Sequence, residues 1–133
     1  EPWLFGLVYG LYILGAATTK DFSDMEGDRQ GGCDTLPIRF GIETSAKMIA
    51  PFFVLPFVLQ FGLAYAGFFT GHRLFLMLLG VVLSVWGGYV VYLILRNPLK
   101  LATEANHVSW KHMYLIMLVG QLGTAFAYLF PLF

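Results

Sequence analysis

The stretch LFLMLLGVVLSVWGGYVVYLIL, from Leu74 to Leu95, contains no residue that is charged at neutral pH. Its length matches the roughly 20 apolar residues that an α-helix needs to cross the hydrocarbon core of a bilayer. In lipid, backbone polar groups are satisfied only in helices or closed barrels, and this stretch lacks the alternating pattern of a barrel strand. The stretch therefore predicts a transmembrane helix.

Three further apolar stretches of similar length accompany it. They run from about Trp3 to Thr19, from about Met48 to Phe69 and from about Met113 to Phe133, and the first is expected to continue as a helix to residue 28. With 58% hydrophobic and 12% charged residues, the chain is more apolar and less charged than a soluble domain. The sequence predicts an all-α fold in one domain over residues 1–133, a multi-span transmembrane helical bundle with spans at about 3–28, 48–69, 74–95 and 113–133.

The charged residues indicate how the chain is oriented and what it does not bind. The formal net charge of zero gives no reason to expect a nucleic-acid partner, and the single cysteine, Cys33, excludes an internal disulfide. Seven of the eight Lys and Arg residues lie in the first and third connections, and only Arg73 lies in the second. Because cytoplasmic loops carry an excess of Lys and Arg, we expect an integral, multi-pass membrane protein with its polar connections on the cytoplasmic side.

Small residues recur at helical spacing in two spans, where close helix–helix packing is their expected role. They are Gly80, Ser84, Gly87 and Gly88 in the third span and Gly120, Gly123 and Ala127 in the fourth. Pro51 is expected in the first turn of the second span, whereas Pro56 is expected to kink or unwind that helix locally. Trp3 and Trp110 fit interface anchors, and Gln121 fits a hydrogen bond between helices.

An acidic run follows the first span. Asp21, Asp24 and Asp28 are spaced i, i+3, i+7, which places them on one face of a helix. Like charges on one face repel each other, and these lie at a helix C-terminus, the end that disfavours negative charge. A bound cation would relieve both effects, and an all-oxygen ligand set favours Mg²⁺, Ca²⁺ or Mn²⁺ over zinc. Because Mg²⁺ commonly combines one or two carboxylates with phosphate oxygens, the run predicts a site for a metal-bridged phosphate ligand.

Two alternative interpretations of the acidic run remain open at this point. A solvated loop of mixed charge is one, but the run begins beside the membrane boundary, where carboxylates are costly, and Gly31 and Gly32 end the helix directly after it. An ion-coupled membrane transporter that uses the carboxylates as a cation site is the other. Transporter sites usually lie near the bilayer midplane within broken helices, whereas this run lies at a helix end beside a loop.

The run KDFSDMEGDR at residues 20–29, followed by TLPIRFG at residues 35–41, resembles the second aspartate-rich motif of the UbiA superfamily of intramembrane prenyltransferases. The resemblance implies a membrane bundle of about nine helical spans, in which two aspartate-rich motifs hold Mg²⁺ and bind the diphosphate of an isoprenyl diphosphate. It implies that Asp24 and Asp28 ligate the metal and that Asp21 binds metal or orients the acceptor. It also implies that Lys20 and Arg29 contact phosphate oxygens.

The activity implied by the resemblance is Mg²⁺-dependent transfer of an isoprenyl group, among membrane lipid, to a lipophilic acceptor. The acceptor would be an aromatic quinone precursor, a chlorophyllide or a glyceryl phosphate lipid. The family's first motif, of the type N-x-x-x-D-x-x-x-D, is absent from this sequence. We therefore expect the chain to be the C-terminal half of a prenyltransferase domain, inactive without the N-terminal half that carries the first motif. A CDP-alcohol phosphotransferase is a further alternative, but the D-G-x-x-A-R element of that family is missing here.

Overall fold

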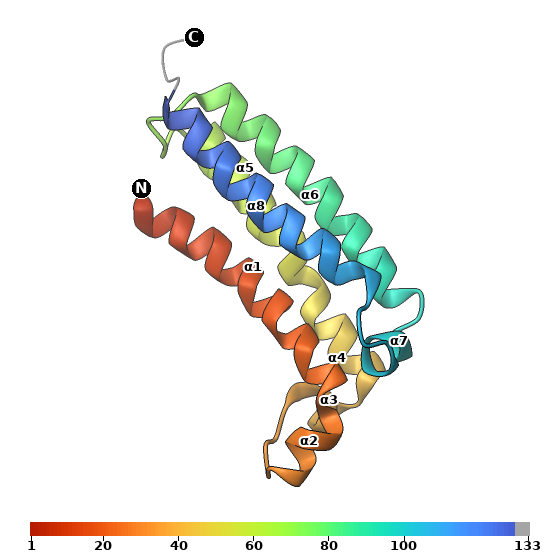
Figure 1. The fold of residues 1–133 in the computed structure, drawn as a ribbon. Helices are drawn as coiled ribbons and strands as arrows, with labels where there is room; N and C mark the ends of the chain where they lie inside the picture. The colour runs from red at the N-terminus through yellow and green to blue at the C-terminus, as the bar shows by residue number, and fades with distance from the viewer. Residues whose placement is uncertain (130–133) are drawn as a thin grey trace.

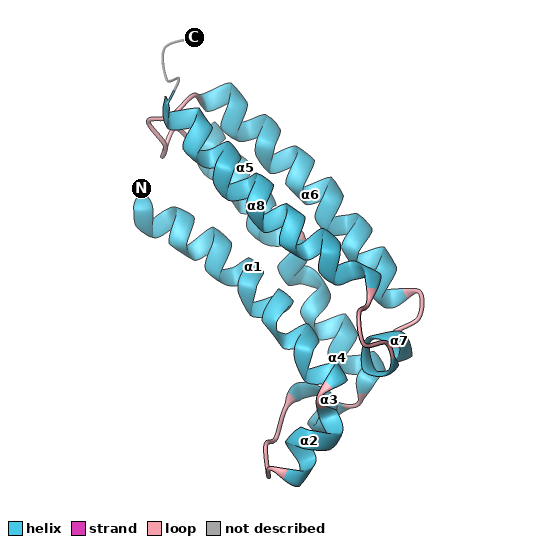
Figure 2. Ribbon diagram, in the orientation of Figure 1, coloured by secondary structure: helices cyan, strands magenta, loops and turns pink. Residues whose placement is uncertain are grey.

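A computed structural model describes residues 1–129 of the chain. Four of its helical segments are long and apolar enough to cross a membrane, namely Pro2–Ser23, Ile42–Tyr65, Arg73–Leu95 and Val108–Leu129 (Figure 1). The described residues form helices and connecting loops, with no strand among them (Figure 2). The predicted all-α bundle of membrane-length helices is therefore confirmed, while positions 130–133 of the fourth predicted span lie outside the described residues.

The long helices pack together and the short ones gather at one end. In chain order the elements are α1 (Pro2–Ser23), α2 (Met25–Gln30), α3 (Leu36–Phe40), α4 (Ile42–Ile49), the 3₁₀ helix η1 (Ala50–Phe53), α5 (Leu55–Tyr65), α6 (Arg73–Leu95), α7 (Leu99–Thr103) and α8 (Val108–Leu129). Helix α6 packs against both α5 and α8, and α1 lies along one side of this group (Figure 1). The short helices α2, α3 and α7 lie at one end, opposite the α5–α6 connection, the N-terminus and the last turn of α8 (Figure 1).

Two of the helices begin earlier than the sequence predicts. The second membrane-length segment begins at Ile42 rather than near Met48, because α4 is amphipathic and continues into η1 and α5. Ala46 and Ile49 are buried on its inner face, while Glu43 is exposed on its outer face, and such polar outer positions mask a helix from a count of apolar residues. The fourth membrane-length helix, α8, begins at Val108 rather than near Met113.

The second membrane-length segment is unwound where the sequence places its prolines. Helix α4 gives way to η1, and α5 resumes only at Leu55, so the local unwinding expected from Pro56 is confirmed. Pro51 was expected in the first turn of this segment, but it lies inside the segment, because the helix already begins at Ile42. Each proline lacks an amide hydrogen, so the carbonyls of Lys47 and Phe52 lose the donor four residues ahead, and a tighter 3₁₀ turn results.

Glycine brings α6 close to the unwound segment. A Cβ placed on Gly87 would lie 1.8 Å from the carbonyl oxygen of Phe53, and a Cβ on Gly80 would lie 3.0 Å from that of Phe57. Backbones approach this closely only where no side chain intervenes. The packing role predicted for these two glycines is confirmed. Gly88, in contrast, faces open space, with no atom within 4 Å of the position that a Cβ would take.

Helix α1 reaches the rest of the bundle through long aromatic side chains. Tyr9 and Thr124 share a hydrogen bond of 2.8 Å between their hydroxyl groups, and the Tyr12 hydroxyl donates to the carbonyl of Met113 at 2.9 Å. The Tyr9 ring also fills the space beside Gly120, where a Cβ would lie 2.9 Å from it. Tyrosines therefore set the spacing between α1 and α8.

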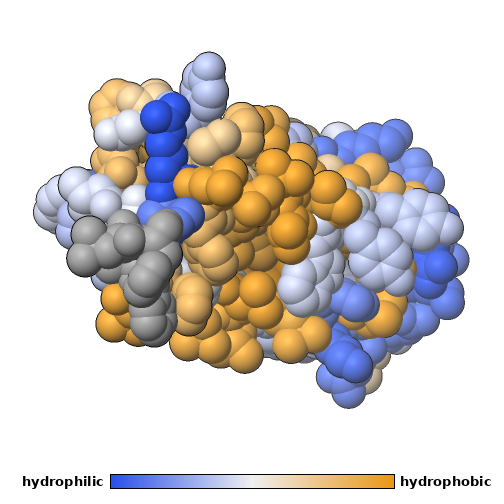
Figure 3. All heavy atoms as spheres, turned by 90° about the horizontal axis from the view of Figure 1, so that it is seen from above, coloured by the Kyte–Doolittle hydropathy of each residue, from blue (hydrophilic) through white to orange (hydrophobic). Residues whose placement is uncertain are grey.

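The outer surface of the helices is apolar, as lipid requires. Large hydrophobic side chains are exposed along every long helix, including Leu14, Val85, Leu118 and Leu122. Figure 3 shows such side chains gathered over the middle of one face, with hydrophilic residues toward its margins. Seven of the eight basic residues lie at the end that holds α2, α3 and α7, and Arg73 begins α6 at the opposite end. Seven of the eight Asp and Glu residues lie at that same end, so the bundle has one end rich in charges of both signs.

Candidate functional site

The acidic run lies where α1 ends and bends into α2. Asp21 is in the last turn of α1, Asp24 joins the two helices, and Asp28 is in α2. The helix predicted to continue to residue 28 is thus interrupted at Asp24, whose φ of −100° and ψ of 6° lie outside helical values. The Ser23 hydroxyl donates to the Lys20 carbonyl at 2.9 Å, and side-chain bonds of this kind bend helices.

The three carboxylates of the acidic run interact through their charges across this bend. The charges of Asp24 and Asp28 both act on Asp21, and the Lys20 ammonium lies 3.8 Å from an Asp24 carboxylate oxygen. Both members of this ion pair are exposed, so it contributes little stability. Within residues 1–129, no three acidic, histidine or cysteine side chains are close enough to hold a metal together. One or two of these carboxylates suffice for Mg²⁺ when phosphate oxygens and water complete its shell, so the donor chemistry fits a metal that arrives with a phosphate ligand.

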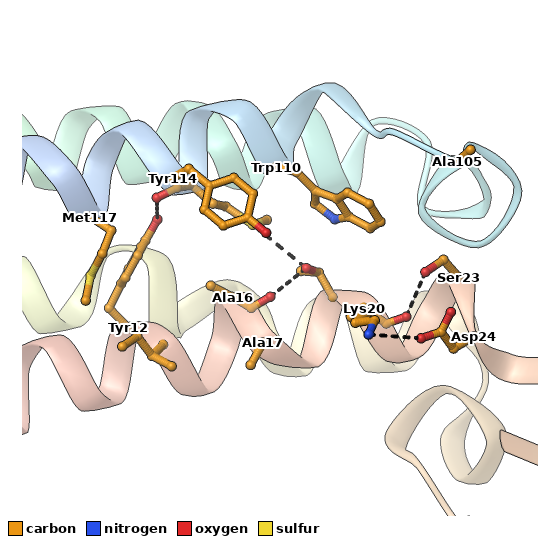
Figure 4. Close-up of a pocket in the computed structure, with 13 residues that line it drawn as sticks. Tyr12, Ala16, Ala17, Lys20, Ser23, Asp24, Ala105, Trp110, Tyr114 and Met117 are labelled. Carbon is orange, nitrogen blue, oxygen red and sulfur yellow. Dashed lines mark hydrogen bonds and ion pairs between the residues drawn. The ribbon is translucent and has the colours of Figure 1, made fainter. Parts of the chain in front are cut away.

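A groove with a volume of about 750 Å³ lies between α1 and α8 and opens beside this bend (Figure 4). Its lining comes from Tyr12, Ile13, Ala16, Ala17, Thr19, Lys20 and Ser23 of α1, from Asp24, from Ala105, and from Trp110, Met113, Tyr114 and Met117 of α8. The charged residues are at one end and the apolar residues extend toward the middle of the bundle. The groove is therefore amphipathic along its length.

The length of the groove follows from the helix that forms its wall. Tyr12 and Asp24 are twelve positions apart in the sequence, which corresponds to about 18 Å along a helix at 1.5 Å per residue. At the inner end, the Tyr12 ring packs against Phe53 and Phe57, with ring centroids 5.9 Å and 5.1 Å away. Beyond Tyr12, the hydroxyl pair of Tyr9 and Thr124 joins α1 directly to α8. The groove thus has a polar mouth and an aromatic inner end, suited to a long apolar chain with a charged head.

Comparison with known proteins identifies the family that shares this arrangement. The family model described as the UbiA prenyltransferase family matches residues 1–115, which include α1 to α7 and the first turns of α8. The chain belongs to the UbiA prenyltransferase family. The resemblance noted in the acidic run and the TLP segment therefore extends over most of the chain.

Two curated relatives share one name. Digeranylgeranylglyceryl phosphate synthase of Thermococcus sibiricus is 37% identical over 79 residues, 59% of this chain and 26% of that protein. The protein of the same name from Methanosphaera stadtmanae is 26% identical over 123 residues, 92% of this chain and 43% of that protein.

A third relative has a different name. The chloroplastic 2-acyl-4-prenylphloroglucinol 6-prenyltransferase of Humulus lupulus is 37% identical over 62 residues, 47% of this chain and 15% of that protein. The chain spans less than half the length of each of these three relatives. No solved structure is significantly similar to the chain.

The TLP segment of the UbiA motif has a structural explanation here. Thr35 precedes α3 in an extended conformation, and Pro37 is buried near the start of that helix. Gly41 separates α3 from α4 with a φ of +81°, a backbone conformation that residues with a Cβ rarely adopt. The segment connects the acidic bend to the membrane-length α4–α5 segment.

The roles of the other predicted polar residues vary. Arg29 is exposed in α2, and Glu26, which was not assigned to the site, accepts a 2.9 Å hydrogen bond from Gln30. The side chain of Gln121 is exposed on α8 and makes no hydrogen bond within the described residues, so the predicted bond between helices stays a prediction. The ligand roles of Asp21, Asp24 and Asp28 and the phosphate contacts of Lys20 and Arg29 stay predictions.

Two histidines near α8 have structural roles that the sequence did not reveal. His107 is buried just before α8. Its Nδ1 accepts a hydrogen bond from the backbone N–H of Ser109 at 3.2 Å and lies 2.7 Å from the Ser109 hydroxyl oxygen. The His107 side chain thus caps the start of α8. Burial lowers the pKa of His107, with a smaller opposing effect from Glu104. His112 is within α8 and accepts a 3.1 Å hydrogen bond from Trp86 of α6. No pattern in the sequence distinguishes these partners, because they depend on how the helices meet.

Proposed function

We propose that the complete protein is a membrane-embedded prenyltransferase. It transfers an isoprenyl group from an isoprenyl diphosphate to a lipophilic acceptor, and this chain supplies the second aspartate-rich motif and one wall of the donor site. The observation that supports the proposal most directly is the amphipathic groove, whose charged end is formed by residues of the motif itself. Family membership supports the same reaction class.

The isoprenyl chain of the donor lies along the apolar part of the groove. Ile13, Ala16 and Met117 provide apolar surface there, and the Tyr12 ring closes the inner end. Burial of the chain against these side chains supplies binding energy in proportion to the apolar area removed from water. The same surface excludes water from the reacting carbon, which protects the donor from hydrolysis.

The diphosphate of the donor lies at the polar mouth. Lys20 and Asp24 line this mouth. Asp24 and Asp28 are the carboxylates that would hold Mg²⁺ together with phosphate oxygens, and their charges act on Asp21. Mg²⁺, when bound, would neutralise the negative charge that grows on the departing diphosphate. During transfer the bond between the allylic carbon and the diphosphate oxygen breaks, a bond to the acceptor nucleophile forms, and the acceptor loses its proton.

The names of the relatives favour a glyceryl phosphate lipid as the acceptor. Two of the three curated relatives are digeranylgeranylglyceryl phosphate synthases, whereas the plant relative has a phloroglucinol in its name. We further propose that an N-terminal half with the first aspartate-rich motif completes the site. By the distribution of basic residues, the end that holds α2, α3 and α7 faces the cytoplasm.

Binding of an unreactive donor tests the proposal on the full-length protein. The ligand is a geranyl diphosphate analogue in which a methylene replaces the oxygen between the allylic carbon and the first phosphorus, so that the diphosphate does not leave. We expect wild type to bind it only with Mg²⁺ present, and Asp24→Asn/Asp28→Asn to lose this binding. Glu26→Gln is the matched control, since Glu26 is an exposed neighbour engaged with Gln30. Equal binding by wild type and the double variant would contradict the proposal and favour a charged loop or an ion-coupled transporter.

A further inference from the structure

Tyr114 differs from every other tyrosine of this chain in the contacts of its side chain. Each of the other tyrosines lies against a further aromatic ring, either stacked, tilted or edge-on. The Tyr114 side chain makes no ring contact and no hydrogen bond within residues 1–129, and it is 76% exposed. Its ring is therefore free to contact a molecule that enters the groove, which it lines.

The ring lies where the groove changes from polar to apolar. On the α8 wall, Tyr114 is one helical turn beyond Trp110 and one turn before Met117, and all three line the groove. Figure 4 shows the Tyr114 ring leaving α8 on the side of α1, between the Tyr12 end of the groove and the end marked by Lys20. The ring is thus the first large side chain of this wall beyond the charged mouth that is widely exposed.

Contacts of the adjacent residue fix the level of this turn of α8 against α1. The Met113 carbonyl accepts the hydrogen bond of the Tyr12 hydroxyl, and the Met113 sulfur lies 3.8 Å from the Thr19 hydroxyl. The turn that carries Met113 and Tyr114 is therefore level with the part of α1 between residues 12 and 19. In that part, Ala16 and Ala17 line the groove with small side chains that leave room for a ligand.

This level is where the reacting carbon of the donor lies. Ala16 and Ala17 precede Lys20 by four and three residues, which corresponds to about 5–6 Å along the helix. A diphosphate group covers that distance by itself. With the diphosphate at the mouth beside Lys20, the allylic carbon attached to it lies between these alanines and the ring of Tyr114.

We propose that the ring of Tyr114 stabilises the positive charge that develops on the allylic carbon during transfer. This inference rests on the proposed function, because it takes the ligand to be an isoprenyl diphosphate. When the bond between the allylic carbon and the diphosphate oxygen breaks, its electron pair leaves with the diphosphate and the carbon becomes positively charged. The face of an aromatic ring carries partial negative charge and attracts a cation, and the ring itself undergoes no reaction.

The attraction acts mainly on the transition state. The allylic carbon of the bound donor is uncharged, so the ring gains the cation–π interaction only as the bond breaks. Interactions that are stronger in the transition state than in the bound substrate accelerate the chemical step. Tyr114 is then a catalytic residue that acts through its ring and not through its hydroxyl.

The test compares two probes that differ only in charge. One is a saturated chain of geranyl length with a trimethylammonium group at the position of the reacting carbon, and in the other a neutral carbon replaces the nitrogen. Each is titrated into the full-length protein in maltoside detergent with Mg²⁺ and inorganic diphosphate. We expect Tyr114→Leu to weaken binding of the charged probe by about fivefold or more and to leave binding of the neutral probe unchanged. Tyr114→Phe should bind both probes as wild type does, since phenylalanine retains the ring.

Two controls accompany these titrations. Tyr92 is also an exposed tyrosine, but it belongs to α6 and does not line the groove, so Tyr92→Leu should change neither affinity. The methylene analogue of geranyl diphosphate has an uncharged carbon at the reacting position. Tyr114→Leu should therefore bind this analogue with the affinity of wild type.

Fluorinated phenylalanines at position 114 separate the charge on the ring face from the size of the ring. Each added fluorine withdraws electrons from the face, so affinity for the charged probe should fall stepwise while affinity for the neutral probe stays constant. Equal affinity for the charged probe across the series would overturn the inference even if Tyr114→Leu binds it weakly.

Each other outcome also rejects the inference. Equal binding of the charged probe by wild type and Tyr114→Leu means that the ring does not face the charge. A loss shared by the neutral probe means that Tyr114 acts through packing, and a loss shared by Tyr92→Leu means that the charged probe binds outside the groove. If wild type does not bind the methylene analogue with Mg²⁺, the proposed function fails and this inference fails with it.

Discussion

The contact between Gly87 and the Phe53 carbonyl leads to the sharpest prediction for stability. A Cβ on Gly87 would lie 1.8 Å from that oxygen and 2.8 Å from the carbonyl carbon, whereas Gly88, the next residue, has no atom within 4 Å of the same position. Ordinary contact begins at 3.4 Å, so Gly87→Ala requires a separation of about 1.6 Å (3.4 − 1.8) between α6 and the backbone of η1. Backbone on both sides of the contact leaves no flexible side chain to move aside.

The expected loss of unfolding free energy follows from a comparison of Gly87→Ala with Gly88→Ala. Insertion of a methyl group into a packed interface typically costs about 1–3 kcal/mol. Replacement of a helical glycine by alanine gains up to about 1 kcal/mol in backbone preference, and this gain is common to both positions. We therefore expect Gly87→Ala to be less stable than Gly88→Ala by about 1–3 kcal/mol or more, with Gly88→Ala no less stable than wild type.

The assay is reversible unfolding of the full-length protein in mixed micelles, followed by far-UV circular dichroism as the fraction of denaturing detergent rises. The difference in unfolding free energy between the two variants is the measured quantity. Because Phe53 also packs on Tyr12 at the inner end of the groove, Gly87→Ala should in addition weaken binding of the unreactive donor. Equal stability of the two variants, or a lower stability of Gly88→Ala, would refute the close approach of α6 to η1.

Three further predictions concern individual hydrogen bonds. Tyr12→Phe removes the bond to the Met113 carbonyl and should lower the unfolding free energy by about 0.5–1.5 kcal/mol in the same assay; no change would show that the hydroxyl is not bonded. Because burial lowers the pKa of His107 below the unfolded value of 6.5, stability should be full above about pH 6.5 and decrease as the pH falls through the folded pKa, and His107→Gln should flatten that decrease. The bond from Tyr128 lowers the pKa of Glu1, so its stabilising effect should persist above the unfolded pKa of 4.5 and be lost as pH falls through the lower folded value; a Glu1→Gln variant with an unaltered pH profile in this range would contradict this.

The sequence alone predicts the fold class, most of the membrane spans and the family. The continuous apolar run at 74–95 predicts its helix almost residue for residue, because a lipid environment requires both apolar side chains and internally bonded backbone. The position of Pro56 predicts the unwinding near η1, since the missing amide hydrogen is a local property. The acidic run and the TLP segment likewise indicate the family, which the match over residues 1–115 shows.

The sequence alone misplaced features that depend on which face of a helix is covered. The start of α4 was missed because its outer face is polar, and the apolar content of such a segment reveals a helix only when the inner face is known. Gly87 and Gly88 are indistinguishable in the sequence, yet only one of them touches a neighbouring backbone. The two residues differ by about 100° around the helix axis, so the direction of packing decides which one is indispensable.

Local chemistry therefore determined the membrane spans, the proline break and the acidic motif, because each depends on residues adjacent in the chain. Only the tertiary structure decided that Trp110 and Met117 of α8 line one groove together with Tyr12, Lys20 and Asp24, since these two sets of residues come from opposite ends of the sequence. It also decided that the Trp110 N–H is left without a partner among the described residues while that of Trp86 is bonded. Hydrogen bonds between helices depend on their separation and rotation, and those are set by the packing of all the side chains between them.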